Sequence, residues 1–518
     1  MRIINRNESR VKSSLQPGNN QLILVGVLVV AFIVALFFGV SIGQENYFET
    51  YIVLLLLGTP AMLFVLKGNY WIFIPFVIRC GLPAIPIVAG RAVALKEIWL
   101  ALCVIMLAGQ LLIYRSRRPI FNRIEFIPIY VILTWVVIMF FREGIGLAIL
   151  GSAEQGGRKY VGIVLGIISI FVIAHQSISE KQCKWLVKLI LIATFTATVY
   201  ALVNYLFFRV VTVEEAQWAN TYYTYHQILS NFPLILVMWT FSKYSPTEII
   251  FKIKLWAGFI LGFSYSLVMY SGKRMHFALA LLVPVISAVI RRQYAAVMMY
   301  GAAAVILLSI LIVGQGVVDK MPGSVERALS FVDYIPGVEW KSNRIKKTTF
   351  RSTLNEIALE KIAEHPVIGN GLSVSESEII EYEAMEEYAV EEVDLHAFSM
   401  AAGSAWHNTW LGVSTDFGIP CAIIYAIFWL QMFRYAFKLR RDLPVGSAVR
   451  MLVTFLLIMN IGDLLQSWVA GHSLEDLLWI RGWQFGILLA IKFQFEKGAY
   501  YSDESSVGEH DQVLVSKA

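Results

Sequence analysis

The chain has 518 residues, of which 57% are hydrophobic and only 15% are charged, and its mean hydropathy is +0.64. A water-soluble protein of this length cannot bury so much apolar surface, so the composition excludes that class and predicts a polytopic membrane protein. The formal net charge of +6 follows from the distribution of basic loops described below, and it gives no indication of a nucleic-acid partner.

Apolar runs recur along nearly the whole chain, and each is long enough to cross a hydrocarbon layer of about 30 Å as a helix. We therefore expect an all-α fold with twelve to fourteen transmembrane helices. The predicted spans cover residues 21–43, 48–66, 70–89, 96–114, 124–141, 160–176, 185–208, 226–242, 251–270, 276–290, 294–315, 409–433, 448–468 and 476–492.

Basic residues in the short loops predict the orientation of these spans. The first apolar run is longer than the core of a signal peptide, and it follows four basic residues between positions 2 and 12. We expect a retained helix with a cytoplasmic amino terminus. Alternation from that start puts the other basic clusters on the cytoplasmic side as well, at residues 115–123, 181–188, 243–254, 291–292 and 434–450.

The four cysteines fall in predicted helices or in a cytoplasmic loop, so none is placed for a disulfide or a cysteine metal site on the outer face. They are Cys80, Cys103, Cys183 and Cys421.

The prediction divides the chain into four regions. These are a multi-helix region at 1–315, a large extracytoplasmic loop at 316–408, further helices at 409–493 and a polar tail at 494–518 that is expected to be disordered. Within the loop, apolar residues recur at helical spacing from Arg351 to Ala363, which predicts an amphipathic helix along the membrane surface. The acidic stretch from Glu376 to Asp394 is typical of a solvated, mobile face, with a cation site or a lid as the alternative.

Two groups of polar residues lie at the predicted outer boundary of the membrane. His407 and Asn408 precede the span at 409–433, where a polar side chain can cap the helix and where an imidazole can also catalyse. Lys273, Arg274 and His276 lie in a tight outer turn, which the positive-inside rule disfavours. Their side chains could reach toward lipid headgroups, or the guanidinium could bind a phosphate through two oxygens at once.

Four segments carry a resemblance to a known family. They are YSGKRMH at 270–276, RSTLNEIALEKIAEHPVIGNGLS at 351–373, WHNTWLGVSTDFGIP at 406–420 and SLEDLLWIRGWQFGILLA at 473–490. In this order and topology they resemble the bacterial O-antigen ligase and O-antigen polymerase family of membrane glycosyltransferases. The resemblance covers about residues 270–490. The chain departs from the family in having Gly-Lys-Arg at 272–274 instead of a Ser-Arg pair, and in its acidic stretch.

The resemblance implies transfer of a polyprenyl-diphosphate-linked glycan on the periplasmic face of the bacterial inner membrane, without a metal or another cofactor. The acceptor would be a glycan, a lipid or a protein, and the product a surface polysaccharide such as the O-antigen of lipopolysaccharide or an exopolysaccharide. By the same resemblance, His407 is matched to the family's helix-initiating histidine, while Arg274 and Arg351 are matched to its two arginines.

We expect His407 to accept the proton of the acceptor hydroxyl, and Arg274 and Arg351 to bind the diphosphate. Direct displacement would invert the anomeric centre. Asn408 is expected to cap or orient, and three arginines in other outer loops could complete the anion site: Arg142, Arg158 and Arg209. The sequence leaves ligase and polymerase open, and it does not identify the sugar. A lipid-linked glycan transporter or flippase remains the alternative class.

Overall fold

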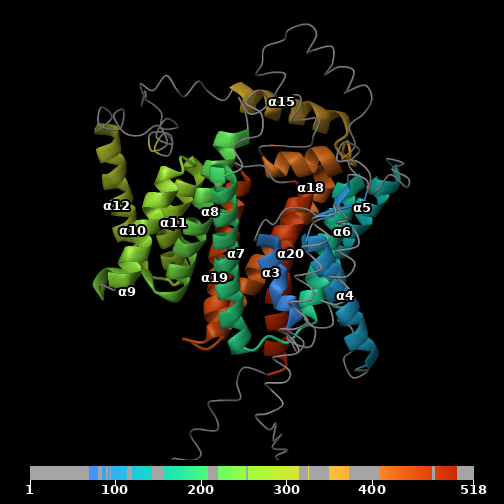
Figure 1. Ribbon diagram of the computed structural model, residues 1–518, viewed down its shortest axis with the longest axis horizontal. Coiled ribbons are helices and arrows are strands. Elements are labelled where there is room, and N and C mark those ends of the chain that lie inside the picture. The colour runs from blue at the N-terminus through green and yellow to red at the C-terminus, as the bar shows by residue number, and fades with distance from the viewer. Residues whose placement is uncertain are drawn as a thin grey trace, which may run out of the picture. The chain divides into compact units, whose positions relative to one another are not determined.

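The computed structural model describes residues 69–79, 85–88, 91–93, 95–113, 120–142, 157–207, 220–252, 255–313, 325, 329, 349–372, 406, 408–468 and 473–498. These residues are mainly helical (Figure 1). The chain divides into two compact units, one formed by residues 1–70 and 84–93 and the other by residues 71–83 and 94–518.

The described part of the first unit contains a β-hairpin. Strand β1 (Ile85–Val88) pairs antiparallel with β2 (Arg91–Val93), with an irregularity in register between Pro86 and Val88. The expectation of a continuous transmembrane helix over 70–89 was therefore wrong, but outside this hairpin the described elements are helices, in agreement with the expected all-α class. The segment contains three prolines, of which those at 83 and 86 lie near and in β1 and lack the N–H that a helix needs, and it contains β-branched residues that favour a strand.

The second unit contains the helices. They are α3 (Phe73–Arg79), α4 (Leu95–Ile113), α5 (Ile127–Arg142), α6 (Gly157–Ala174), α7 (Glu180–Phe207), α8 (Asn220–Lys243), α9 (Pro246–Phe251), α10 (Leu255–Tyr270), α11 (Arg274–Ile290), α12 (Tyr294–Val313), α15 (Thr349–Glu364), α18 (Thr409–Asp442), α19 (Ala448–Ser467) and α20 (Leu474–Glu496). Short 3₁₀ turns, η1 (Tyr70–Ile72) and η2 (Ile124–Phe126), precede α3 and α5. Every predicted span from 96–114 onward coincides with one of these helices. The spans at 21–43 and 48–66 lie outside the described residues.

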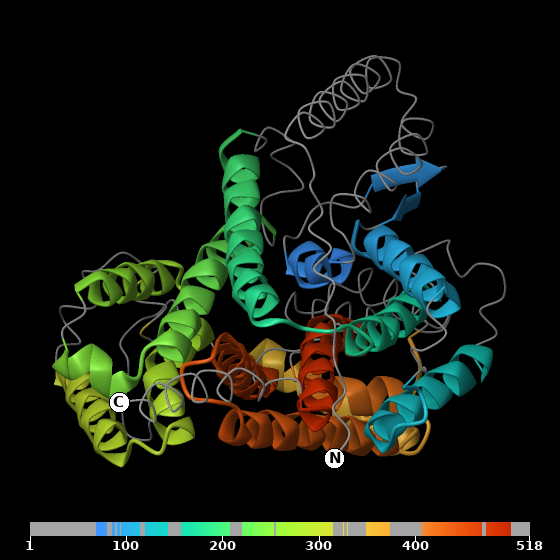
Figure 2. The same ribbon diagram turned by 90° about the horizontal axis from the view of Figure 1, so that it is seen from below.

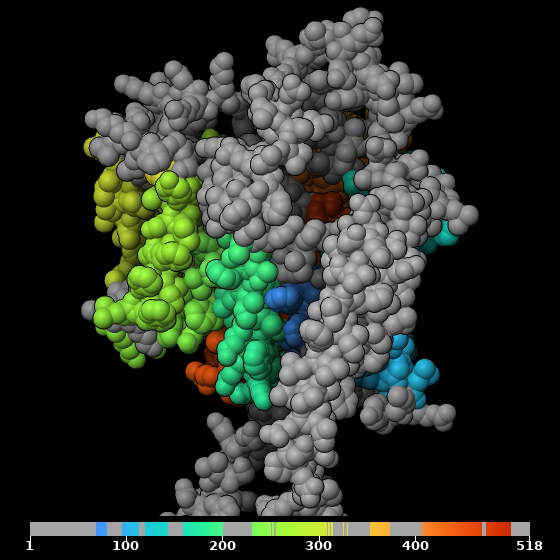
Figure 3. Space-filling model, in the orientation of Figure 1, coloured from blue at the N-terminus to red at the C-terminus, as the bar shows by residue number. Residues whose placement is uncertain are grey.

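Four of the described helices are long and apolar enough to cross a membrane: Ile124–Arg142, Glu180–Val199, Thr409–Asp442 and Ala448–Ser467. Shorter apolar helices accompany them, including most of α6, α10, α11 and α12. Large apolar side chains on α10 and α12 are exposed, among them Leu255 and Val313, and these helices reach the surface seen in Figure 3. Such surface is unfavourable in water and suits contact with lipid chains. The described helices are those of a membrane protein.

Helices α6 and α20 pack closely through small residues (Figures 1 and 2). On α6, Gly162 and Gly166 lie against Glu475 and Leu478 of α20, and on α20, Gly482 and Gly486 lie against Gly166 and Ile173 of α6. A Cβ on Gly482 would lie 2.7 Å from the carbonyl oxygen of Gly166. Paired small residues at this spacing let two helix backbones approach in a membrane. The pattern is readable from the sequence, but its pairing partner is not.

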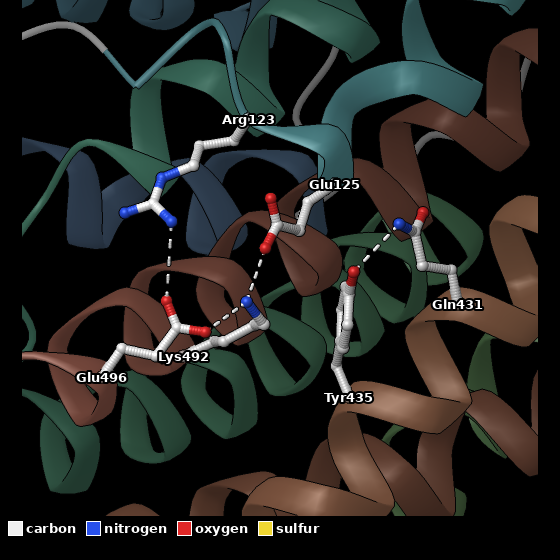
Figure 4. A network of polar contacts seen from close by, with 6 residues as sticks. All are labelled: Arg123, Glu125, Gln431, Tyr435, Lys492 and Glu496. Atoms are coloured by element: carbon white, nitrogen blue, oxygen red, sulfur yellow. Dashed lines mark hydrogen bonds and ion pairs between the residues drawn. The ribbon is translucent and has the colours of Figure 1, made fainter.

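Contacts at the helix ends show how neighbouring helices run. The Lys492 amine near the end of α20 donates to Glu125 before α5, at 2.5 Å, and to Glu496, at 2.6 Å (Figure 4). Thus α5 begins at the side where α20 ends. Arg291, which follows α11, donates to the carbonyl oxygen of Ser242 in the last turn of α8, at 2.7 Å, so α8 and α11 end on the same side. Which side of the membrane these ends face stays a prediction.

Candidate functional site

Helix α18 is bent sharply near its start. Gly418 has φ 82° and ψ 162°, which lies outside the helical region, and Pro420 follows it. Fifteen residues of straight helix would separate Trp410 from Tyr425 by roughly 22 Å along the axis. Their ring centroids are instead 5.8 Å apart. Residues 409–417, called the first limb below, therefore fold back over the remainder of α18 (Figure 1).

The bend interrupts the helical hydrogen bonds, and a distant segment replaces them. Pro420 has no N–H to donate to Asp416, whose carbonyl oxygen accepts from the Gly371 N–H at 2.8 Å. The Ile419 N–H donates to the Pro366 carbonyl oxygen at 2.9 Å. The carbonyl oxygen of Thr415 accepts from the Asn370 N–H at 2.8 Å. The loop His365–Gly371 thus supplies the partners that a regular helix would have given these groups.

Two glycines allow this close approach. Gly369 has φ +79°, and a Cβ there would lie 2.5 Å from the backbone nitrogen of Gly418. A Cβ on Gly418 would in turn collide with the carbonyl group of Val367. The glycines of HPVIGNG and DFGIP are therefore required where the two segments meet. The bent first limb and the docked loop 365–371 are together called the cradle.

Helix α5 supports the cradle from one side. The Trp135 indole N–H donates to the Phe417 carbonyl oxygen at 2.8 Å, which satisfies another group freed by the bend. The Arg142 guanidinium donates to the Gly369 carbonyl oxygen at 2.8 Å. Arg142 is exposed and thus adds a cation to the rim of the cradle. Of the three arginines considered for the outer loops, Arg142 is the one that the described contacts bring to the loop 365–371.

His407 lies outside the described residues, but both of its neighbours in the chain are fixed to the cradle. The Trp406 side chain is 6% exposed, and its indole N–H donates to the Asp416 carboxylate at 2.9 Å. The Asn408 side-chain oxygen accepts from the N–H groups of Trp410, at 2.9 Å, and Leu411, at 3.3 Å. The capping role expected of Asn408 is confirmed.

Helix α15 begins and ends close to the predicted positions, at Thr349 and Glu364. Its Leu354 and Ala358 are buried against Trp406, whereas Leu359 is 56% exposed. One stripe of the helix therefore packs on the cradle and another remains free for contact outside the protein. Arg351 lies in the first turn of α15. Its alignment along a membrane surface stays a prediction.

The turn between α10 and α11 holds a second group of cations. Arg274 is the first residue of α11 and is partly buried. Burial lowers the pKa of the neighbouring Lys273 amine to about 8, so this group still carries a charge at neutral pH. The His276 imidazole is buried and lies 2.7 Å from the Ser230 hydroxyl of α8. This contact fixes α11 against α8.

Among the remaining candidates, Arg158 lies in the first turn of α6. Arg209 and the acidic stretch from Glu376 to Asp394 lie outside the described residues. The side chains of Arg351 and Arg158 also lie outside the described part of the structure.

Beneath the first limb lies a buried polar cluster that the sequence reasoning missed. Asp463 of α19 and Arg481 of α20 form an ion pair at 2.5 Å, and the Arg481 side chain is 2% exposed. The Arg481 guanidinium lies 5.2 Å from the Trp429 ring, and that of Arg79 lies 5.9 Å from the Trp483 ring. Three charged residues inside apolar runs were the available signal. Their meeting from three helices was not readable.

The described residues offer cations and a backbone cradle that is held by hydrogen bonds from a distant loop. No protein-family model matches the chain, and no curated protein matches it either. Its function is therefore argued from these residues.

Proposed function

We propose that the chain is a membrane glycosyltransferase of the O-antigen ligase or polymerase type. It transfers a glycan from a polyprenyl diphosphate to an acceptor hydroxyl, in the biosynthesis of a surface polysaccharide. The protein resides in a bacterial inner membrane with its amino terminus in the cytoplasm, and it reacts on the periplasmic face. The acceptor is a glycan, a lipid or a protein, and no cofactor takes part.

One observation carries the proposal: the loop 365–371 is docked on the bend at 416–420 next to residue 407. Residues 365–371 and 415–420 belong to two separate stretches of the resemblance, and their backbones exchange three hydrogen bonds of 2.8–2.9 Å. The two sequence neighbours of His407, Trp406 and Asn408, both make hydrogen bonds to the first limb of the same cradle. Such a rigid frame is what a catalytic imidazole needs in order to act by positioning.

The proposed glycan transfer requires a base and stabilisation of the leaving group. The acceptor oxygen attacks the anomeric carbon while the bond from that carbon to the diphosphate oxygen breaks, and the electron pair leaves with the diphosphate. His407 takes the proton from the acceptor hydroxyl. Arg274 and Arg351 bind the diphosphate and balance its developing charge. The single displacement inverts the anomeric centre.

Arg142 supports the cradle and supplies a further cation at its rim. One of its nitrogens is committed to the Gly369 carbonyl oxygen, at 2.8 Å. Because it is exposed, its other nitrogens can meet an anionic ligand. We assign Arg142 a positioning role for the loop 365–371. Arg158 and Arg209 remain candidates for the same anion site.

The test is deletion of the gene in its host, followed by complementation with the wild type, His407→Ala or Arg274→Ala. Surface glycans are then resolved by chain length on a gel. Full-length polymer that accumulates on the polyprenyl lipid indicates a ligase, and single lipid-linked repeats indicate a polymerase. An unchanged glycan pattern after deletion would contradict the enzyme assignment.

The buried cluster of Arg79, Asp463 and Arg481 favours a second candidate, a lipid-linked glycan transporter. Ionisable groups inside a helix bundle are typical of transport pathways. The two candidates differ in their dependence on His407. A transporter would keep its activity in the His407→Ala variant and would lose it when the cluster is neutralised.

A further inference from the structure

The interior of the bundle contains more positive than negative charge. Arg79 of α3 interacts electrostatically with both Asp463 and Arg481, and the three groups together carry one net positive charge. Asp463 lies 2.5 Å from Arg481, so this carboxylate is already engaged. Arg79 is the additional cation. A charge without a counter-ion is costly in a medium of low dielectric constant.

Several donors of this cluster are also unsatisfied. The Nε of Arg481, the Nε and Nη2 of Arg79 and the indole nitrogen of Trp483 are buried, and none has a hydrogen-bond partner within the described part of the chain. Trp483 is fully buried, and its ring lies beneath the Arg79 guanidinium at 5.9 Å. All four atoms are donors. Buried donors of this kind require an acceptor, because an unpaired buried donor has lost its hydrogen bonds to water without a replacement.

The cluster is adjacent to the cradle. Tyr425 is buried and interacts electrostatically with Arg481 and Asp463, and its ring lies 5.8 Å from that of Trp410 in the first limb. The Tyr425 ring also makes an edge-to-face contact with the Trp429 ring, with 6.3 Å between the centroids. A single layer of aromatic side chains therefore separates the first limb from the charged groups. A ligand held at the cradle is close to this site.

We propose that Arg79 and Arg481, with the indole N–H of Trp483, form a binding site for an oxyanion inside the helix bundle. A phosphate or carboxylate group offers several acceptor oxygens to the fork of a guanidinium, and its charge neutralises the additional cation. The group belongs either to the head of a membrane lipid or to a free anion. The site uses none of the residues proposed for glycan transfer, so the inference does not rest on the proposed function.

The test measures thermal unfolding of the purified full-length protein in detergent. Inorganic phosphate or diphosphate is titrated against chloride at matched ionic strength, and a second arm uses a polyprenyl diphosphate. Binding to the folded state raises the midpoint, and we expect an increase of about 2–5 °C at saturation in at least one arm. A response to the lipid alone identifies a headgroup. A response to both identifies a site open to free anions.

Two variants and a control locate the binding. Arg79→Gln removes the additional cation and should abolish the increase. Trp483→Phe keeps an aromatic ring but removes the indole N–H, and it should raise the half-saturating concentration of the anion several-fold. Arg441→Gln removes an exposed charge at the end of α18 and should respond as the wild type does.

Either of two results would overturn the proposal. One is a wild-type protein whose midpoint moves in neither arm. The other is an increase that persists unchanged in Arg79→Gln and Trp483→Phe. If that increase were lost in Arg274→Gln instead, the anion would bind at the proposed transfer site, and the proposed function would stand without this inference.

Discussion

At the scale of single residues, the cradle depends on two glycines and one buried carboxylate. Gly418, at φ 82° and ψ 162°, occupies a region of backbone space that is essentially restricted to glycine. Any side chain there would be strained and would also press on Val367. The bend and the docking of the loop 365–371 therefore both require a glycine at position 418.

Substitution of Gly418 by alanine should separate the loop from the bend. We expect a loss of at least about 1–3 kcal/mol from backbone strain, with a further loss from the collision with Val367. Gly446→Ala is the matched control, because Gly446 has φ +88° with open space around it. Thermal unfolding and glycan transfer are measured for both. Equal effects would mean that the docked loop is not needed.

The hydrogen bond from Trp406 to Asp416 holds the residue before His407 in place. Trp406→Phe keeps an aromatic ring but removes the indole N–H, so the buried Asp416 carboxylate loses one donor. We expect destabilisation of about 1–3 kcal/mol, together with reduced transfer. Trp256→Phe is the control, since Trp256 of α10 is 70% exposed. Unfolding midpoints that are the same for both variants would contradict a role for this contact.

At the scale of elements, the helices were readable and their deviations were not. Apolar runs predicted each span from 96–114 onward, since length and hydropathy decide whether a helix can cross a membrane. The run at 409–433 did not reveal the reversal at Gly418, because the bend is stabilised by the distant residues 366–371. The helix also continues to Asp442, since the basic residues of its last turns are good helix formers.

The site was predictable in part. The positions of Asn408 as a cap and of residues 351–363 as a helix followed from local pattern. The contact of Arg142 with Gly369 joins residues 227 positions apart, and the meeting of Arg79, Asp463 and Arg481 joins three helices. No local pattern encodes such pairs. The role expected of His407 stays a prediction.

The pairing of α6 with α20 gives a prediction at this scale. Gly482→Ala would place a methyl group 2.7 Å from the carbonyl oxygen of Gly166, and that backbone can yield only if the helices separate. We expect a cost of about 1–3 kcal/mol from overpacking. Gly262→Ala in α10 is the control, since that glycine has open space around it. A drop in unfolding midpoint no larger than that of the control would show that the interface tolerates a methyl group.

At the scale of the whole molecule, the proposed orientation can be tested by labelling. Glu364→Cys, at the exposed end of α15, should react in cells with a thiol reagent that passes the outer but not the inner membrane. Val445 lies in the turn after α18 and is 86% exposed, and Val445→Cys should react only after the inner membrane is opened. The described native cysteines, Cys103, Cys183 and Cys421, are buried and give little background. The opposite labelling pattern would contradict the predicted orientation.

In the proposed mechanism, the cradle presents His407 as the base of a glycan transfer. The most direct measurement follows release of polyprenyl diphosphate from a lipid-linked glycan by purified protein in vesicles. We predict that His407→Ala lowers the rate by about 10²–10⁴-fold and leaves the unfolding midpoint unchanged, because the imidazole acts in proton transfer. Transfer by His407→Ala at the wild-type rate would contradict the account.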